Sequence, residues 1–168
     1  LKTILVLGSG PIKIGQAAEF DFSGSQAVRA LREDGYEVIL VNSNPATIQN
    51  DPEMADKVYI EPLLPDTVRR ILEIEKPCAL LAGMGGQTAL NIASELAHDG
   101  SLERIGVELI GSDLDAIDKA EDRELFNQVC NSINLPISNA IACNSMDEVI
   151  AAADTIGSWP ILLSLIHI

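Results

Sequence analysis

Short, continuous apolar runs recur along the first two thirds of the chain, separated by polar loops and by segments of helical periodicity. Four of these runs are predicted to be strands: Ile4–Leu7, Val38–Val41, Ala79–Leu81 and Val107–Ile110. Uninterrupted apolar runs of this length are typical of strands that are buried on both faces, as in a parallel sheet.

The segments between these runs have the apolar spacing of amphipathic helices. The spacing predicts helices over Ser25–Asp34, Asp66–Glu75 and Thr88–Leu96, and Gly35 is placed to end the first of them. Strands and helices that alternate at this spacing predict βαβ units with right-handed crossovers. Up to about Ser112 the sequence therefore predicts an α/β, Rossmann-like domain with a parallel sheet.

A second, smaller unit is predicted after this domain. Its expected elements are helices over Asp113–Ala120 and Glu121–Ile133, a strand over Ile137–Ala142, a helix over Ser145–Ile156 and a strand over Ile161–Ile166. The third helix is expected to be capped by Ser145 and to turn Val149, Ile150 and Ala153 inward. A piece of roughly 40 residues is smaller than domains that normally fold alone, so we expect the opening of a domain whose remainder is absent.

Composition narrows the choice of partners. The 168 residues include 11 basic and 25 acidic side chains, which gives a net charge of −14. A chain this acidic repels phosphate backbones and anionic lipid, so neither nucleic acid nor a membrane surface is expected as its main partner. No apolar run approaches the ~20 residues that span a bilayer. The first residues resemble a strand and not a signal peptide, and the initial Leu1 in place of Met suggests that the true N-terminus is missing.

The cysteine pattern argues against a metal or disulfide framework. Cys78, Cys130 and Cys143 are far apart and odd in number, and no C-x-x-C pair exists. Reduced and mostly buried thiols in a cytosol-like compartment are expected. The two histidines, His98 and His167, have no companions at the spacing of metal ligands.

A glycine-rich loop follows the first predicted strand, from Gly8 to Gln16. Glycines at the carboxyl end of a strand allow close approach of a ligand and can present N–H groups to an anion. The loop departs from the dinucleotide fingerprint, since Lys13 occupies its third glycine position and Asn42 replaces the acidic residue after the second strand. It departs from the P-loop as well, because Gln16 and Ala17 replace Lys-Ser/Thr. Ligand contact and a purely structural turn both remain open.

Two further polar loops follow predicted strands. Asn42–Thr47 comes after the second strand, and Met84–Thr88 comes after the third, where Thr88 is a candidate helix cap. Open α/β sheets form their crevices at the carboxyl ends of strands, so the three loops are candidates for one shared crevice. Loops of this composition are also common without any ligand.

Arg123 lies at the start of the helix that leads into the second unit, in the run Lys119–Arg123. A guanidinium at this position can clamp a phosphate through two hydrogen bonds. The alternative is a surface arginine paired with Glu121 or Asp122, worth under ~1 kcal/mol.

Several blocks together resemble the large chains of carbamoyl phosphate synthases, in the same order along the chain. These blocks are Leu7–Ile12, Ile14–Gln16, Glu19–Asp21, Val41–Thr47, Asp51–Asp56, Tyr59–Pro62, Gly85–Asn91 and Ala116–Arg123. The resemblance covers the chain to about Gly157. The blocks Asn42–Thr47 and Asp51–Asp56 resemble the first, bicarbonate-phosphorylating half of these proteins.

The resemblance implies a pre-ATP-grasp domain over residues 1–126 and the incomplete start of an ATP-grasp domain over residues 127–168. It implies a cytoplasmic ligase of arginine and pyrimidine synthesis that makes carbamoyl phosphate from bicarbonate, ammonia taken from glutamine, and two ATP. Mg²⁺ or Mn²⁺ would be required, and the partners would be a glutamine amidotransferase small chain and the remaining large-chain domains. By the same resemblance Arg123 matches an arginine that contacts ATP.

The departures from the family pattern matter equally. Ser164 stands where a second ATP-contacting arginine is expected, and the glycine-rich phosphate loop, the adenine pocket and the acidic metal ligands are absent. We therefore expect a truncated or frame-shifted gene product that is inactive alone. Gly83 and Met84 also replace the more usual Pro-Thr. The alternatives are the leading domain of another ATP-grasp enzyme, such as a biotin-dependent carboxylase, and a non-catalytic α/β binding module.

Overall fold

A five-stranded parallel sheet forms the centre of the larger part of the protein. The computed structural model describes residues 2–10, 17–138, 140–143 and 145–157. The strands are β1 (Thr3–Leu7), β2 (Glu37–Val41), β3 (Lys57–Tyr59), β4 (Ala79–Leu81) and β5 (Glu108–Ile110). Their order across the sheet is β3-β2-β1-β4-β5. The α/β fold class and the four predicted strands are confirmed.

The central strand pairs with β2 on one side and with β4 on the other. Ile4 is opposite Val38 in the first pair, and Leu5 is opposite Leu80 in the second. From β1 the chain adds β2 and β3 on one side, and then crosses back from β3 to place β4 and β5 on the other side. Strand order reverses at β1, so the carboxyl edge of this strand is the topological switch point of the sheet.

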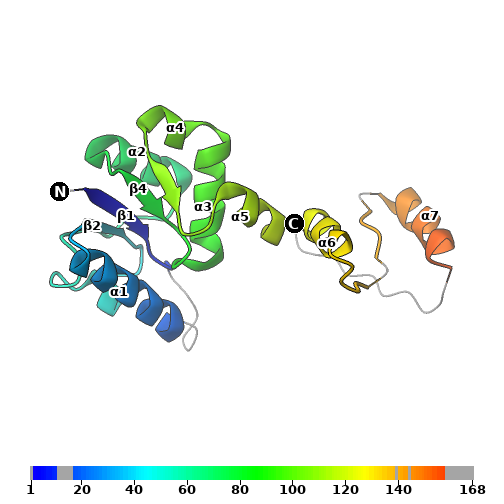
Figure 1. Ribbon diagram of the computed structural model, residues 1–168, viewed down its shortest axis with the longest axis horizontal. Coiled ribbons are helices and arrows are strands. Elements are labelled where there is room, and N and C mark those ends of the chain that lie inside the picture. The colour runs from blue at the N-terminus through cyan, green and yellow to red at the C-terminus, as the bar shows by residue number, and fades with distance from the viewer. Residues whose placement is uncertain (1, 11–16, 139, 144, 158–168) are drawn as a thin grey trace. The chain divides into compact units, whose positions relative to one another are not determined.

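Helices cover both faces of the sheet (Figure 1). One face carries α1 (Ala17–Glu33), and the other carries α2 (Pro65–Glu75), α3 (Gly86–His98) and the short α4 (Ser101–Ile105). Alternate strand residues supply the two cores. Val6 and Leu40 pack with Val28 of α1, whereas Leu5 and Ile39 lie in the cluster that holds α2 and α3.

Strand β3, the 3₁₀ turn η1 (Ile48–Asn50) and helix α4 are absent from the sequence prediction. The three-residue β3 lies at a sheet edge and begins with a charged residue, so no apolar run marks it. Side-chain contacts secure it instead, because Lys57 and the Tyr59 hydroxyl both donate to the Glu75 carboxylate of α2. The hydrogen bond from Lys57, with that from Tyr59, lowers the pKa of Glu75.

Helix α1 begins eight residues before the predicted Ser25. The first turns contain Ser23 and Gly24, which are weak helix formers, and this composition hid the start of the helix. Tertiary contacts with Gln49 hold these turns, as described below. The predicted end is confirmed, since Gly35 has a φ of +86° and its N–H bonds to the Arg32 carbonyl.

The chain divides into two compact units, Leu1–Asp118 and Lys119–Ile168. Helix α5 (Leu114–Glu121) runs through the division, and the second unit contains α6 (Arg123–Ser132) and α7 (Met146–Ile156). The Ser145 hydroxyl accepts a hydrogen bond from the Glu148 N–H, which confirms the predicted cap of α7.

Two expectations for the second unit are wrong. Residues 137, 138 and 140–142 form no strand, and no neighbouring strand is present among the described residues to pair with them. On α7 the expectation of an inward side chain is wrong for Ile150, which is 60% exposed, whereas Val149 and Ala153 are half-buried and Ala152 is the buried residue of the helix. The predicted strand Ile161–Ile166 lies outside the described residues.

The cysteines are free, but only Cys130 is buried, whereas Cys78 is exposed and Cys143 is intermediate. The expectation of mostly buried thiols is therefore wrong. Among the described helices, none combines the length and the apolarity needed to cross a membrane.

Candidate functional site

The carboxyl edge of the sheet brings three polar segments together where β1, β2 and β4 end. A Cβ atom on Gly8 would lie 2.7 Å from Cγ of Asn42. A Cβ atom on Gly85 would lie 2.6 Å from the carbonyl oxygen of Gly8. Only glycine allows these approaches, so the row Asn42, Gly8 and Gly85 is closely packed across the switch point.

Asn42 connects the ends of β1 and β2. Its side chain is fully buried, and Oδ1 accepts hydrogen bonds from the N–H groups of Gly10 at 3.1 Å and Asn44 at 3.2 Å. Nδ2 has no partner among the described residues. In a dinucleotide-binding fold an acidic residue at this position binds the ribose of the cofactor. Here the Asn42 amide binds backbone N–H groups of the protein itself. Asn42 therefore holds Gly8–Gly10, the described part of the glycine loop, in a structural turn.

An open pocket of about 450 Å³ lies beside this turn. Ser43 and Thr88 line it, so two of the three predicted loops meet there. The third loop is adjacent, since a Cβ on Gly10 would lie 3.2 Å from the Ser43 hydroxyl, while residues 11–16 lie outside the described residues. Thr88 is not the cap of α3, because Gly85 occupies the N-cap position.

Sequence reasoning missed the fourth wall of the pocket. This wall is the connection between β3 and α2, which contributes Ile60, Glu61, Pro62 and Leu63. Because β3 itself gave no sequence signal, nothing indicated that this connection reaches the carboxyl edge. The carboxylate of Glu61 adds negative charge to the lining, which does not favour an anionic ligand in this pocket.

Gln49 holds the beginning of α1. Its side chain is fully buried, and Nε2 donates to the Phe20 carbonyl at 3.0 Å and to Oδ1 of Asp21 at 3.2 Å. A Cβ on Gly24 would lie 2.7 Å from the Gln49 carboxamide. The Phe20 ring in turn lies against Gly86, where a Cβ would be 3.1 Å from the ring. The β2–β3 connection, α1 and the start of α3 are therefore packed together.

Arg123, the residue proposed from sequence to contact ATP, is the first residue of α6 and is exposed. Asp122 is the N-cap of this helix, and its carboxylate accepts the Leu125 N–H at 2.8 Å. The carboxylate of Asp122, one of the two partners considered for Arg123, is therefore the cap of α6. Within the described residues the Arg123 guanidinium forms no ion pair.

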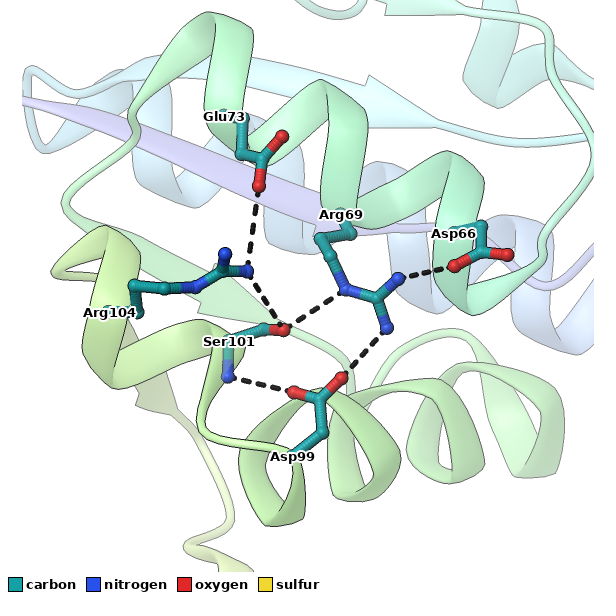
Figure 2. A network of polar contacts seen from close by, with 6 residues as sticks. All are labelled: Asp66, Arg69, Glu73, Asp99, Ser101 and Arg104. Atoms are coloured by element: carbon teal, nitrogen blue, oxygen red, sulfur yellow. Dashed lines mark hydrogen bonds and ion pairs between the residues drawn. The ribbon is translucent and has the colours of Figure 1, made fainter.

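A polar network joins α2, the residue that follows α3, and α4 (Figure 2). The Arg69 guanidinium donates to Asp66, to the Ser101 hydroxyl at 3.0 Å and to Asp99 at 2.8 Å. Asp99 also accepts the Ser101 N–H at 2.8 Å. Hydrogen bonds from Ser101, assisted by the Arg69 charge, lower the pKa of Asp99. Every member has a partner within the network, which we call the helix clamp because it joins α2, the end of α3 and α4.

A second open pocket, of about 440 Å³, lies between α1 and the residues before β3. Arg32 lines it, but its guanidinium donates to the carbonyls of Glu53 at 2.7 Å and Met54 at 3.0 Å, and it lies 3.3 Å from Asp56. These bonds attach the segment before β3 to α1. The arginine therefore has a structural role in this pocket.

The described residues do not fit a metal centre. No three His, Cys, Asp or Glu side chains within them gather closely enough to hold an ion. Mg²⁺ and Mn²⁺ prefer several oxygen ligands, so this part of the chain supplies no site for the metal that the sequence resemblance implies.

The chain matches the family described as the carbamoyl phosphate synthase preATP-grasp domain over residues 1–119. It is 57% identical to the N-terminal section of the carbamoyl phosphate synthase large chain of Aquifex aeolicus, over 97% of this chain and 29% of that protein. It is 55% identical to the arginine-specific chloroplastic large chain of Arabidopsis thaliana, over 97% of this chain and 14% of that protein. The chain thus spans less than a third of the length of these relatives.

Solved structures with the same fold are more distant in sequence. The biotin carboxylase domain of a single-chain bacterial carboxylase matches 98% of this chain and 36% of its own, with a TM-score of 0.66 and 16% identity. An ADP complex of N5-carboxyaminoimidazole ribonucleotide synthetase matches 95% of this chain and 36% of its own, with a TM-score of 0.62 and 16% identity. At this identity the likeness concerns the fold alone.

Proposed function

The chain belongs to the carbamoyl phosphate synthase preATP-grasp family, and from this premise we propose that it forms the leading part of a synthase large chain. The complete enzyme would make carbamoyl phosphate from bicarbonate, ammonia taken from glutamine, and two ATP. The observation that carries the proposal is the continuous match to synthase large chains over nearly the whole chain. The first, bicarbonate-phosphorylating half of the large chain is the part to which the sequence blocks correspond.

The domain boundary of this proposal falls at residue 126. Residues 1–126 would form the pre-ATP-grasp domain, and residues 127–168 would open the ATP-grasp domain. The first domain would be mainly structural and would form one wall of the nucleotide site. Its side chains support this role, because Asn42, Gln49 and Arg69 form hydrogen bonds with other parts of the same domain.

Arg123 would supply the contact with ATP from within this segment. An exposed guanidinium on the first turn of a helix can reach a ligand phosphate, and its five donors match phosphate oxygens. Asp122 leaves the guanidinium available, since its carboxylate caps α6. The metal, Mg²⁺ or Mn²⁺, would be held by residues elsewhere in the enzyme, and no step is assigned to it here.

The partners would be the remaining domains of the large chain and a glutamine amidotransferase small chain, in the cytoplasm. Large apolar side chains on the second unit support the first of these. Leu125, Phe126, Ile133, Met146 and Ile150 are all exposed. A contiguous ATP-grasp domain would cover such side chains, which otherwise remain in contact with water.

Substitution of Arg123 in a longer synthase chain that carries this segment tests the ATP contact. Charge-assisted hydrogen bonds contribute ~1.5–3 kcal/mol, so Arg123→Ala should weaken bicarbonate-dependent ATP turnover by roughly 10- to 100-fold in kcat/KM. Arg123→Lys should restore only part of it, because lysine lacks the planar fork. Arg70→Ala removes another exposed arginine, on α2, and is the matched control. Equal kinetics for Arg123→Ala and Arg70→Ala would contradict the contact.

The leading domain of a biotin-dependent carboxylase is the second candidate. Solved carboxylases share the fold, which favours the same general position before an ATP-grasp domain. Their identity to this chain, at most 20% in these cases, is far below that of the synthase large chains. Biotin-dependent ATP turnover by the longer chain, with no carbamoyl phosphate formed, would support this second candidate over the first.

A further inference from the structure

Two of the twelve glycines follow an aspartate, and both of these Asp-Gly pairs come directly after a helix. Asp34 and Gly35 follow α1, and Asp99 and Gly100 follow α3. An aspartate before glycine is prone to close into a cyclic imide, because glycine has no Cβ that would hinder attack by its own backbone nitrogen. The two pairs are therefore candidate sites of spontaneous covalent modification.

The backbone is nearly the same at the two pairs. The N–H groups of Asp34 and Asp99 each donate to the carbonyl four residues earlier, at 3.0 Å. The N–H groups of Gly35 and Gly100 each donate to the carbonyl three residues earlier, at 3.0 and 3.1 Å. The φ angles of these glycines are +86° and +75°, and a Cβ on either would meet no atom within 4 Å. Any difference in reactivity between the pairs must therefore come from the aspartate side chains.

The carboxylate of Asp99 is held in the helix clamp. Oδ1 accepts the Ser101 N–H at 2.8 Å, and Oδ2 accepts a hydrogen bond from the Arg69 guanidinium at 2.8 Å (Figure 2). Because both oxygens are bound, Cγ cannot turn toward the Gly100 nitrogen unless these bonds break. Hydrogen bonds from Ser101, assisted by the Arg69 charge, also lower the pKa of Asp99 and keep the carboxyl ionised. An ionised carboxylate is a poorer target for a nucleophile than a carboxylic acid.

The carboxylate of Asp34 is not held in this way. Asp34 is exposed, and within the described part of the chain its carboxylate takes part in no hydrogen bond or ion pair. Its Cγ needs only a rotation of the side chain to approach the Gly35 nitrogen. We propose that Asp34–Gly35 is a site of isoaspartate formation, and that Arg69 and Ser101 protect Asp99 from the same reaction.

The reaction needs no enzyme, cofactor or oxidant. The Gly35 nitrogen attacks Cγ of the Asp34 carboxylic acid, a C–N bond forms, and a C–O bond breaks with loss of one water molecule. Water then opens the resulting five-membered succinimide. Attack at the side-chain carbonyl restores aspartate, whereas attack at the main-chain carbonyl leaves an isoaspartate whose main chain runs through Cβ and Cγ. The mass is unchanged, and the main chain between α1 and β2 becomes longer by one methylene group.

The test is incubation of the folded 168-residue chain at neutral pH in water enriched in oxygen-18, followed by proteolysis in ordinary water and mass spectrometry. Each passage through the succinimide leaves one heavy oxygen, and the isoaspartyl peptide elutes separately. Label should enter Asp34 about three- to thirtyfold faster than Asp99, the range expected for one exposed ion pair and one hydrogen bond. In concentrated urea the two pairs should react at similar rates. Equal rates in the folded chain, or no label at Asp34, would overturn the proposal.

Arg69→Ala tests the protection of Asp99. It should raise the labelling rate of Asp99 roughly two- to fivefold and leave Asp34 unchanged. Partial unfolding of the variant would raise both rates, so Asp34 serves as the internal reference. Arg70→Ala removes the neighbouring exposed arginine of α2 and should change neither rate. Asp34→Glu should remove the fast site, because glutamate would have to close a six-membered ring. An unchanged ratio of the two rates in Arg69→Ala would contradict the protective role of the arginine.

Discussion

Oδ1 of Asn42 lies 3.1 Å from the backbone nitrogen of Gly10, so a side chain at the end of β2 holds the turn at the end of β1. The same oxygen accepts the Asn44 N–H. Two backbone segments that are thirty-two residues apart in sequence are therefore fixed by one buried acceptor. The glycine turn takes its position from this bond and from the close approach of Gly8 to Asn42.

Replacement of Asn42 by alanine should lower the free energy of unfolding by about 1–3 kcal/mol, because the buried N–H of Gly10 loses its acceptor. Urea unfolding measured by circular dichroism checks this. Asn91→Ala is the matched control, since Asn91 is exposed and its side chain accepts a hydrogen bond from the Gln87 side chain. A loss for Asn42→Ala no larger than for Asn91→Ala would show that the bond does not stabilise the turn.

Gly24→Ala should destabilise the protein, although alanine is ordinarily the better helix residue by about 1 kcal/mol. The new Cβ would lie 2.7 Å from the Gln49 carboxamide, which is buried and hydrogen-bonded. In a Gln49→Ala background the clash disappears, so Gly24→Ala should cost less there. A double-mutant cycle from urea unfolding measures this coupling, and additive effects would argue against the contact.

Gly83→Ala is the control for that cycle. A Cβ on Gly83 would meet no atom within 4 Å, and its φ is not positive. Its effect on the free energy of unfolding should therefore stay within about 0.5 kcal/mol.

Acid should weaken the clamp of Figure 2 through Asp99. Hydrogen bonds from Ser101 and the charge of Arg69 lower the pKa of this carboxyl from its ordinary value of 3.8. The folded state therefore binds fewer protons than the unfolded state. The stabilisation is complete above pH 3.8 and is lost as the pH falls through the lowered value.

The measurement is the urea midpoint between pH 7 and pH 2.5 for the unmodified chain and for Asp99→Asn. The difference between the two proteins should be largest at pH 7 and should shrink at the acid end. Asp34→Asn, at an exposed position, is the control. A difference that stays constant over the whole range would rule out the ionised Asp99 as its source.

The first unit should exchange its amide protons more slowly than the second. Its sheet is covered on both faces, and its core includes Leu5, Leu40 and Leu80, all fully buried. Helices α6 and α7 contribute one buried residue each, Cys130 and Ala152. Native-state exchange should give graded, lower protection after Leu135, and uniform protection through α7 would contradict this expectation.

The sequence predicted those elements whose own apolar residues form a clear strand or helix pattern. The strand Val38–Val41 and the helix Asp66–Glu75 follow directly from their apolar residues, and both are present within a residue of their predicted ends. The early part of α1 was missed, because Ser23 and Gly24 are weak helix formers and the distant Gln49 holds these turns through Phe20 and Asp21. Strand β3 was missed because its apolar run consists of two residues, Val58 and Tyr59, which is too short to indicate an edge strand.

The candidate site was predictable in part for the same reason. Two of its walls, at Ser43 and Thr88, follow from the rule that crevices form at the carboxyl ends of parallel strands. The wall at Leu63 depends on β3 and could not be placed without it. The role of Asn42 could not be predicted either. An asparagine that follows a strand can bind a ligand or its own backbone, and the sequence does not distinguish the two.

We propose that this chain contributes a scaffold and one ATP contact to a synthase, and not the phosphoryl-transfer apparatus. The most direct test is ADP release by the purified 168-residue chain with ATP, Mg²⁺ and bicarbonate, against a blank without protein and a blank without bicarbonate. Catalysis of phosphoryl transfer depends on groups that position and neutralise the phosphates, and the described residues hold no metal cluster for this purpose. The account predicts no ADP above either blank, and bicarbonate-dependent ADP release by the pure chain would contradict it.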